Sequence, residues 1–546
     1  MGIFLFSANE NCSMSNARYN RASGREKMIR SEMLARLEKE TKIWDVVVIG
    51  GGATGLGAAV EAASRGYSTL LVEQGDFSQG TSSRSTKLIH GGIRYLQQGN
   101  ISLVLEALQE RGLLLQNAPH LVRHQSFVVP NYSWWEGPFY GVGLKVYDVL
   151  AGKLGLKKST VLTREMVLEK IPTLEPQDLK GGVIYYDGQF DDARLAVTLA
   201  QTAEDLGACV INYMQVVDLI KTSGLVSGVR LADKLSGNEY EINAKTVVNA
   251  TGIFVDAVLK MDTAEHENII SPSQGVHIVL DKSFLPGDTA IMVPHTEDGR
   301  VLFAVPWHDR VIVGTTDTPI EKPSLEPLPF KEELTFLLDH AAKYLTKDPT
   351  AADVLSAFAG IRPLINAGNG KKTAALSRDH HLNISPSGLI TIAGGKWTTY
   401  RKMGEDTIDA AIPIGALEPR KSRTRNLSLN GWSTDDEGNA PYALYGKNAR
   451  YIKRLVDIDP SLGEPIHERL PYNFAEIVWA VRNEMAIFLD DVLARRTRAL
   501  ILDAKASMEA APAVVRVMAK EMGKDEAWEK DQLQRYLGRA AAYLVS

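Results

Sequence analysis

Cysteine is scarce in this chain, which has only Cys12 and Cys209 among its 546 residues. Neither has a partner at C-x-x-C spacing, so a cysteine-ligated iron–sulfur cluster, a zinc ribbon and a disulfide framework are all disfavoured. Such sparing use of cysteine is typical of a reducing compartment. Any redox chemistry of this chain therefore requires an organic cofactor.

Long apolar runs and an excess of basic residues are also lacking. No stretch reaches the roughly 18 apolar residues of a membrane span, and the apolar run 3–6 is too short for a signal peptide. The 61 lysines and arginines are outnumbered by 66 aspartates and glutamates, which gives a net charge of −5. The overall charge thus predicts no nucleic-acid partner, and attraction to an anionic surface requires a local patch.

The length predicts about three or four domain-sized units. With 45% hydrophobic and 23% charged residues, the composition is that of an ordinary globular protein. Residues 1–41 are interpreted as an appended tail, with Met28 as an alternative initiator and a short helix over 28–40. Residues 18–42 carry eight basic and four acidic side chains, a local net charge of +4.

The apolar patterns predict a mixed α/β fold. Residues 45–49 and 68–73 have the pattern of buried strands and residues 53–65 that of a helix, which together form one βαβ unit. Short apolar runs between 275 and 315 predict an antiparallel sheet, and the chain beyond about 420 is predicted to be mostly helical.

A glycine-rich turn follows the first predicted strand. Gly50, Gly52 and Gly55 form the pattern G-x-G-x-x-G ahead of the helix, and Glu73 ends the second strand. Such glycines allow a tight turn and the close approach of a pyrophosphate, while the acidic side chain accepts a hydrogen bond from a ribose hydroxyl. The pattern predicts a dinucleotide site, and an acidic residue at this position disfavours NADP.

Three later features favour FAD over NAD as the dinucleotide. A polar, glycine-rich loop over 74–92 suits wrapping around a larger cofactor. Strand–glycine–helix corners occur at 249–256 and 394–399. A helix N-terminus at the last corner would stabilise negative charge on a reduced flavin.

Taken together, the motifs resemble the FAD-dependent glycerol-3-phosphate dehydrogenases. The resemblance covers about residues 42–505 and is carried by GGGATGLGAA, TSSRSTKLIHGGIRYL, NATGIFVD, VGTTDT, AGIRPL, LSRDH, GGKWTTYRK and EMAIFLDDVLARRTR. It implies a DAO-like Rossmann FAD-binding fold with an antiparallel-sheet substrate domain and a C-terminal helical domain. It further implies oxidation of sn-glycerol 3-phosphate to dihydroxyacetone phosphate, with electrons passed to a membrane quinone. The D-x-[DN]-x-[DN]-G pattern of calcium-binding relatives is lacking, and no metal site is predicted.

The domain organisation follows from the motif positions. A tail over 1–41 precedes a discontinuous FAD-binding domain over 42–412, formed by 42–110, 180–270 and 356–412. Substrate-binding or cap segments over 111–179 and 271–355 lie between these parts. A helical domain follows over 413–546.

The substrate phosphate requires cationic side chains, preferably the planar fork of arginine. The resemblance places Arg94, Tyr95, Arg362 and Lys396 near the substrate, with Arg94, Arg362 and Arg378 as candidates for the phosphate. In addition to the first glycine turn and Glu73, the candidate FAD contacts are Ser82, Ser83, Lys87, His90, Gly91, Gly252, Asp256, Gly395, Lys396 and Thr398.

Transfer of a hydride from substrate C2 to flavin N5 also requires a base for the hydroxyl proton. Histidine is the usual candidate near neutral pH. His277 is favoured, His90 and Lys396 stay as alternatives, and Asp317 could orient one of them.

Other functions remain open at this point. The chain could be a glycerol-3-phosphate oxidase that makes hydrogen peroxide, an amino-acid or amine oxidase on the same fold, or a flavin-binding scaffold. The resemblance implies a cytoplasmic protein held peripherally on the inner face of the cell membrane. The basic tail 18–42 and the aromatic and lysine-rich stretch 133–158 are the candidate contacts. A homodimer is a further open alternative.

Overall fold

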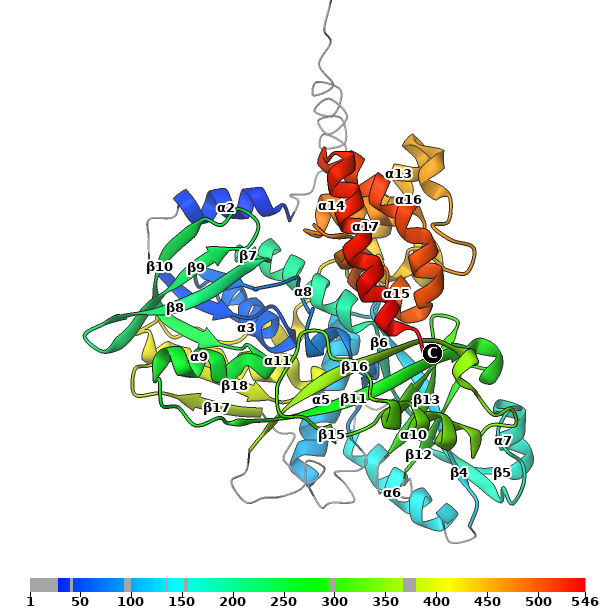
Figure 1. The fold of residues 1–546 in the computed structure, drawn as a ribbon. Coiled ribbons are helices and arrows are strands. Elements are labelled where there is room, and N and C mark those ends of the chain that lie inside the picture. Colours follow the sequence, from blue (N-terminus) through cyan, green and yellow to red (C-terminus); the bar gives the residue numbers. More distant parts are fainter. Residues whose placement is uncertain are drawn as a thin grey trace, which may run out of the picture.

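A computed structural model gives the fold of this chain (Figure 1). It describes residues 28–39, 43–92, 100–133, 136–151, 156–294, 301–366 and 380–545. The helical C-terminal part, coloured orange to red in the picture, gathers at one end of the molecule, above two sheets formed by the rest of the chain.

The first sheet contains the predicted βαβ unit. Its main strands run in the order β17-β18-β10-β1-β2-β7, and β8 and β9 extend it through β10. β1 pairs in parallel with both β2 and β10, because crossover segments return the chain to the same end of the sheet. The strands are β1 (Trp44–Ile49), β2 (Thr69–Val72), β7 (Cys209–Ile211), β8 (Met214–Thr222), β9 (Leu225–Asp233), β10 (Glu239–Asn249), β17 (His380–Ile384) and β18 (Ile390–Gly394).

Three helices pack beside one another on this sheet: α3 (Ala53–Ser64), α8 (Asp192–Asp205) and α11 (Tyr400–Ile414). α3 and α11 approach closely through small residues. A Cβ on Gly57 would lie 2.6 Å from the Tyr400 carbonyl oxygen, and one on Gly404 would lie 2.6 Å from the Gly57 carbonyl oxygen. The close contact fixes the start of α3 relative to the corner that precedes α11.

The second sheet is mainly antiparallel, as predicted for residues 275–315, although β12 pairs with β4 in parallel. Its strands run in the order β15-β11-β14-β13-β12-β4-β6-β3, with β16 beside β11 and β5 beside β6. They are β3 (Leu88–Ile89), β4 (Val122–Asn131), β5 (Thr160–Thr163), β6 (Gly181–Phe190), β11 (Ile270–Asp281), β12 (Thr289–Val293), β13 (Leu302–Trp307), β14 (Arg310–Gly314), β15 (Thr318–Pro319) and β16 (Val354–Ile365). Strands β6 and β16 join this sheet, although their residues fall in the segments predicted for the FAD-binding domain.

Further helices pack beside the two sheets and form the C-terminal part. α5 (Ile101–Asn117), α6 (Glu136–Ala151), α7 (Arg164–Lys170), α9 (Val255–Asp262) and α10 (Lys331–Ala342) lie within the first 413 residues. The helical region, here residues 413–546, contains α12 (Asp436–Asn439), α13 (Ala449–Ile458), α14 (Phe474–Asn483), α15 (Ala499–Leu502), α16 (Ala504–Met522) and α17 (Glu526–Ala540). Its core includes Val279, Trp307 and Phe358 of the second sheet, so the two parts share one apolar interior.

The predicted helix of the tail is present as α2 (Arg30–Lys39). Met33 and Leu37 are buried, and the Arg30 guanidinium pairs with the Asp233 carboxylate at 2.7 Å. The tail therefore packs on the first sheet from residue 28 onward. Among the residues that the structure describes, none of the helices combines the length and the apolar character that a bilayer crossing requires.

Candidate functional site

The first glycine turn joins β1 to α3. Gly50 has φ +113°, and a Cβ there would lie 2.6 Å from the Ala250 carbonyl oxygen. A Cβ on Gly55 would lie only 1.9 Å from the Gly50 carbonyl oxygen. Only glycine satisfies both positions, and the result is an open turn at the positive end of a helix, which suits a pyrophosphate.

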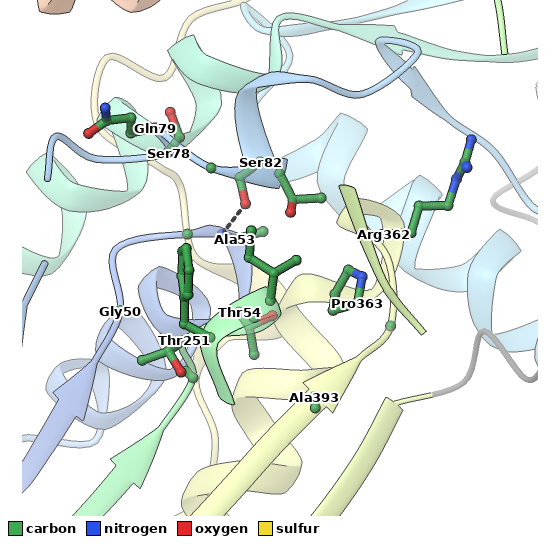
Figure 2. Close-up of a pocket in the computed structure, with 18 of the residues that line it drawn as sticks. Gly50, Ala53, Thr54, Ser78, Gln79, Ser82, Thr251, Arg362, Pro363 and Ala393 are labelled. Carbon is green, nitrogen blue, oxygen red and sulfur yellow. Dashed lines mark hydrogen bonds between the residues drawn. The ribbon is translucent and has the colours of Figure 1, made fainter. Parts of the chain in front are cut away.

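The polar loop 74–92 folds back over the start of α3 (Figure 2). The Ala53 amide donates a hydrogen bond to the Ser82 hydroxyl at 2.9 Å, and the Trp397 indole donates to the Ser82 carbonyl at 2.9 Å. Ser82 thus joins the first glycine turn to the last one. Residues of this loop line the cavity that is described below.

Glu73 lies beside the turn, as expected for a residue that contacts a ribose. Its carboxylate accepts hydrogen bonds from the Gly51 amide at 2.7 Å and from the Gly75 amide at 2.8 Å. Burial raises the pKa of Glu73 above its ordinary value, against the effect of these two amides. A carboxylate has about four acceptor sites, so it can still receive a hydroxyl hydrogen bond.

One cavity of about 410 Å³ connects the three predicted corners. This volume falls within the range of about 300–1,000 Å³ that is usual for small-molecule sites. The corners at 50–54, 250–258 and 392–398 line it together, although more than 300 residues separate the first from the last. Predicted site residues on its wall are Gly50, Gly52, Glu73, Ser82, His90, Gly252, His277, Arg362, Gly395, Lys396 and Thr398.

Other predicted residues lie behind this wall and have structural contacts. The Asp256 carboxylate accepts from the Ile269 and Ile270 amides at 2.9 and 3.2 Å. The Gly91 amide donates to the Tyr147 hydroxyl at 2.8 Å. Gly55 lies in the first turn of α3, against the Gly50 carbonyl. The Lys87 ammonium donates to the Asp192 carboxylate and to the Ser83 carbonyl. These contacts give Asp256, Gly91, Ser83 and Lys87 roles in holding the site's framework.

Arg362 on β16 occupies the part of the wall predicted to bind the substrate. Its guanidinium donates to the Asp317 carboxylate at 3.1 Å, and to the Thr315 hydroxyl and the Thr316 carbonyl at 3.0 Å each. The Asp317 carboxylate also accepts from the Ser273 hydroxyl. Asp317 therefore orients Arg362, rather than a base, and the 21% exposed Arg362 side chain adds positive charge to the cavity wall.

His277 on β11 also lines the cavity and is only 2% exposed. Its Nε2 lies 2.9 Å from the Thr86 hydroxyl, and its ring stacks on Phe358 with centroids 4.9 Å apart. Burial and the positive charges of Lys87 and Arg362 hold the pKa of His277 well below its usual value. The imidazole is therefore neutral near pH 7 and able to accept a proton.

His277 can act as a base only through Nε2. Nδ1 is buried, and among the described residues the structure gives it no hydrogen-bond partner. Nε2 faces the hydroxyl of Thr86, a residue that lines the cavity, and this hydroxyl can donate or accept, so the contact fits either tautomer. The base role requires the tautomer with the proton on Nδ1 and the lone pair on Nε2.

Arg94, Tyr95 and Arg378, predicted near the substrate, lie outside the described residues, as do Trp134 and Trp135 of the stretch 133–158. His90 lies on the cavity wall, and its backbone amide and carbonyl face the Thr398 hydroxyl at 3.3 Å each. Its backbone thereby connects the loop 74–92 to the last corner.

Sequence reasoning missed two parts of the site. Met214, Gln215 and Val216 on β8 line the cavity near Glu73, and the signal for them was only an ordinary strand pattern. The second omission is the stretch 484–498, which reaches the loop 74–92 from the helical region. Its acidic residues at 484, 490 and 491 are followed by arginines at 495, 496 and 498, and this pattern does not indicate which residues they pair with.

Comparison with protein families gives two matches. The family model "FAD dependent oxidoreductase" matches residues 45–401, and "C-terminal domain of alpha-glycerophosphate oxidase" matches residues 393–529. Mitochondrial glycerol-3-phosphate dehydrogenase of Macaca fascicularis is 43% identical over 93% of this chain and 75% of its own length. The mitochondrial enzyme of Arabidopsis thaliana is 40% identical over 90% of this chain and 85% of its own length.

Among solved structures, glycerol-3-phosphate dehydrogenase of Bacillus halodurans in complex with FAD has a TM-score of 0.77 at 30% identity. The match covers 94% of this chain and 97% of that one. Glycine oxidase of Geobacillus kaustophilus, at 21% identity and a TM-score of 0.52, shares the fold over 71% of this chain.

Proposed function

This chain belongs to the family of FAD-dependent glycerol-3-phosphate dehydrogenases, and we propose on that basis that it oxidises sn-glycerol 3-phosphate to dihydroxyacetone phosphate. FAD, when bound, supplies the two-electron acceptor for the hydride that leaves substrate C2 and reaches flavin N5. The residues present fit this cofactor, because Gly252 lines the cavity and a Cβ there would meet no protein atom within 4 Å, which leaves that corner open for a ligand.

One observation carries the proposal: the neutral imidazole of His277 and the guanidinium of Arg362 lie on the wall of the same cavity as the three glycine corners. The reaction needs a proton acceptor for the C2 hydroxyl and a cation for the phosphate, and His277 and Arg362 supply these two functions. The carboxylate of an amino acid could also pair with Arg362, so the choice of substrate is supported by the 43% and 40% identity to glycerol-3-phosphate dehydrogenases. We therefore favour the phosphorylated alcohol.

We infer His277 as the base, with Arg94, Arg362 and Arg378 as phosphate ligands and Tyr95 and Lys396 beside the substrate. Support for His277 comes from its place on the cavity wall and its contact with Thr86. Its lowered pKa keeps the ring neutral but also makes it a weaker base. His90 and Lys396 also line the cavity and stay as alternatives. For FAD we infer direct contacts from Gly50, Gly52, Glu73, Ser82, Gly252, Gly395 and Thr398.

A membrane quinone is our proposed acceptor, reached from a peripheral position on the membrane. α5, α6 and β5 lie at the lower end of the molecule in Figure 1 and bear exposed apolar side chains, namely Ile101, Leu105, Val146, Val149 and Val161. Exposed lysines accompany them at positions 145, 157 and 158. Apolar side chains flanked by lysines suit the boundary between acyl chains and headgroups. We call the five exposed apolar residues, together with these three lysines, the apolar surface.

We also propose the domain boundaries given above, with a discontinuous FAD-binding domain over 42–412 and a helical domain over 413–546. Most of the apolar cluster of the helical region is formed by its own residues, to which the second sheet adds Val279, Trp307 and Phe358.

An anaerobic titration tests the proposed function. Purified holoenzyme should be yellow, and glycerol 3-phosphate should bleach it in the absence of oxygen, whereas glycine or proline should not. Addition of a soluble quinone should restore the colour. Rapid return of the colour in air with one hydrogen peroxide per substrate would instead show a glycerol-3-phosphate oxidase.

A further inference from the structure

The cofactor loop, here defined as Asp76–Lys87, has two sides with different neighbours. One side lines the cavity through Ser78, Thr81, Ser82 and Thr86. The other side faces the helical region, residues 413–546. Three buried polar contacts join that side to the helical region or to residues that it holds in place.

The first contact is at Asp76, which is fully buried. Its carboxylate accepts from Arg495 at 2.6 Å, and from the two terminal nitrogens of Arg496 at 2.6 and 2.8 Å. Burial alone would raise the pKa of Asp76, yet the two guanidinium groups keep it below its ordinary value. The start of the cofactor loop is thus charge-paired with the helical region.

The second contact is at Ser83 and Asp192. Arg498 donates to the Ser83 carbonyl at 2.7 Å and to the Asp192 carboxylate at 3.0 Å. Lys87 donates to the same two groups at 2.8 and 2.6 Å. Two cations, one from the loop and one from the helical region, therefore share the same pair of acceptors, and none of these charges is exposed to solvent.

The third contact is at Arg84, close to the C-terminus, which is marked beside β16 in Figure 1. Its guanidinium donates to the Tyr543 hydroxyl at 2.8 Å and to the Glu326 carboxylate at 2.6 Å. Arg539 of α17 lies 3.8 Å from the same Glu326 carboxylate and 2.6 Å from that of Asp490. Arg84 lines the cavity, so this contact extends from the C-terminus to the cofactor wall.

Buried charges are tolerated only when they are paired, and removal of one partner leaves the other uncompensated. The cofactor loop contributes Asp76, Arg84 and Lys87 to such pairs. The helical region supplies both cations that pair with Asp76, and its Arg498 shares the acceptors of Lys87. For Arg84 the charge partner is Glu326, outside the helical region, and Tyr543 of the helical region accepts a hydrogen bond from the same guanidinium. The loop therefore cannot hold this conformation independently of the helical region.

We propose that the helical region is a structural part of the cofactor site, and that Tyr543 and Arg498 are positioning residues that hold the cofactor loop against bound FAD. FAD retention is then determined partly by residues that do not touch FAD. This inference requires only that the site binds FAD. It does not depend on which alcohol is the substrate.

The test compares Tyr543→Phe with the matched control Tyr536→Phe. Both tyrosines are buried in the helical region and both lose one hydroxyl hydrogen bond, but Tyr536 bonds to Ser507 at 2.6 Å, away from the loop. Release of FAD from holoenzyme is followed by the rise in flavin fluorescence after dilution, with circular dichroism as the check on folding.

We expect Tyr543→Phe to release FAD about three- to tenfold faster, because a hydrogen bond from a charged donor is lost, while Tyr536→Phe stays within twofold of the parent. Arg498→Lys should also accelerate release, more than Arg482→Lys, whose partner Glu521 lies within the helical region. Equal release rates for Tyr543→Phe and Tyr536→Phe, whether both unchanged or both faster, would overturn the proposal. Should Arg498→Lys fail to fold, the two tyrosine variants decide the outcome alone.

Discussion

The two ends of the cavity are built in different ways. The cofactor end is mostly backbone: glycine turns, the start of α3 and the Ser82 hydroxyl that meets the Ala53 amide. The substrate end consists of side chains held by other side chains, with Arg362 oriented by Asp317 and His277 oriented by Thr86. At the cofactor end, an added side-chain atom would clash with the backbone. At the substrate end, single side chains can be replaced one at a time, and each replacement weakens binding or catalysis by a limited factor.

The largest effect is expected from Gly55→Ala, which tests the backbone end. The new methyl group would lie 1.9 Å from the Gly50 carbonyl oxygen, so the turn has to open. The variant should purify without colour even with excess FAD. Gly538→Ala is the control, because a Cβ there meets nothing within 4 Å, and it should stay yellow. A yellow Gly55→Ala enzyme with normal FAD affinity would contradict the assignment of this turn.

His277→Ala tests the proton acceptor at the side-chain end. Loss of a general base typically lowers a rate by about 10²–10⁴-fold, so flavin reduction in a stopped-flow experiment should slow by that factor. The dissociation constant for glycerol 3-phosphate should change little. His467→Gln removes a histidine paired with Glu509 far from the cavity and should leave the rate unchanged. An unaffected rate in His277→Ala would move the role to His90 or Lys396.

The lowered pKa of His277 makes a prediction about pH. Because its pKa lies well below the usual value near 6.5, the base is already neutral there. The rate of flavin reduction should stay flat as the pH falls through 6.5 and decline only at more acidic values. Since the unfolded chain binds that proton more readily, His277 should also lower the stability of the fold progressively below pH 6.5. A rate that halves near pH 6.5 would indicate a different base.

Arg362→Gln should have a smaller effect, and mainly on substrate affinity. Charge-assisted hydrogen bonds contribute about 1.5–3 kcal/mol, so the KM for glycerol 3-phosphate should rise about 10- to 100-fold. The kcat of Arg362→Gln should fall by a much smaller factor than the rate of flavin reduction falls in His277→Ala. Arg230→Gln, on an exposed part of β9, is the control. A drop confined to kcat would place Arg362 in the chemical step rather than in phosphate binding.

The smallest effect is expected at the apolar surface, which is separate from both ends of the cavity. Val149 is 79% exposed, and Val149→Glu should weaken binding to vesicles of phosphatidylcholine and phosphatidylglycerol several-fold without changing flavin reduction. Val217→Glu, on the exposed face of β8, is the matched control. Equal vesicle binding by both variants and the parent in a sedimentation assay would exclude this surface.

The contrast between the two ends also explains what could be predicted from the sequence. Gly50, Gly52 and Gly55 have a spacing that by itself specifies the turn, so the βαβ unit with its glycine turn could be predicted from the sequence. The pairing of Asp76 with Arg496 joins residues 420 positions apart, and neither residue carries a local signal of it. The Asp256 carboxylate likewise accepts from the amides of Ile269 and Ile270, which the strand–glycine–helix corner in the sequence does not reveal.

The central claim is that one cavity joins a flavin site to a site for a phosphorylated alcohol. Anaerobic addition of glycerol 3-phosphate to the yellow holoenzyme tests it most directly, with the absorbance of the oxidised flavin as the readout. We predict complete bleaching by one equivalent per bound FAD, followed by recovery of the absorbance on addition of a quinone. A holoenzyme that keeps its colour with glycerol 3-phosphate, or that is bleached equally by an amino acid, would contradict the account.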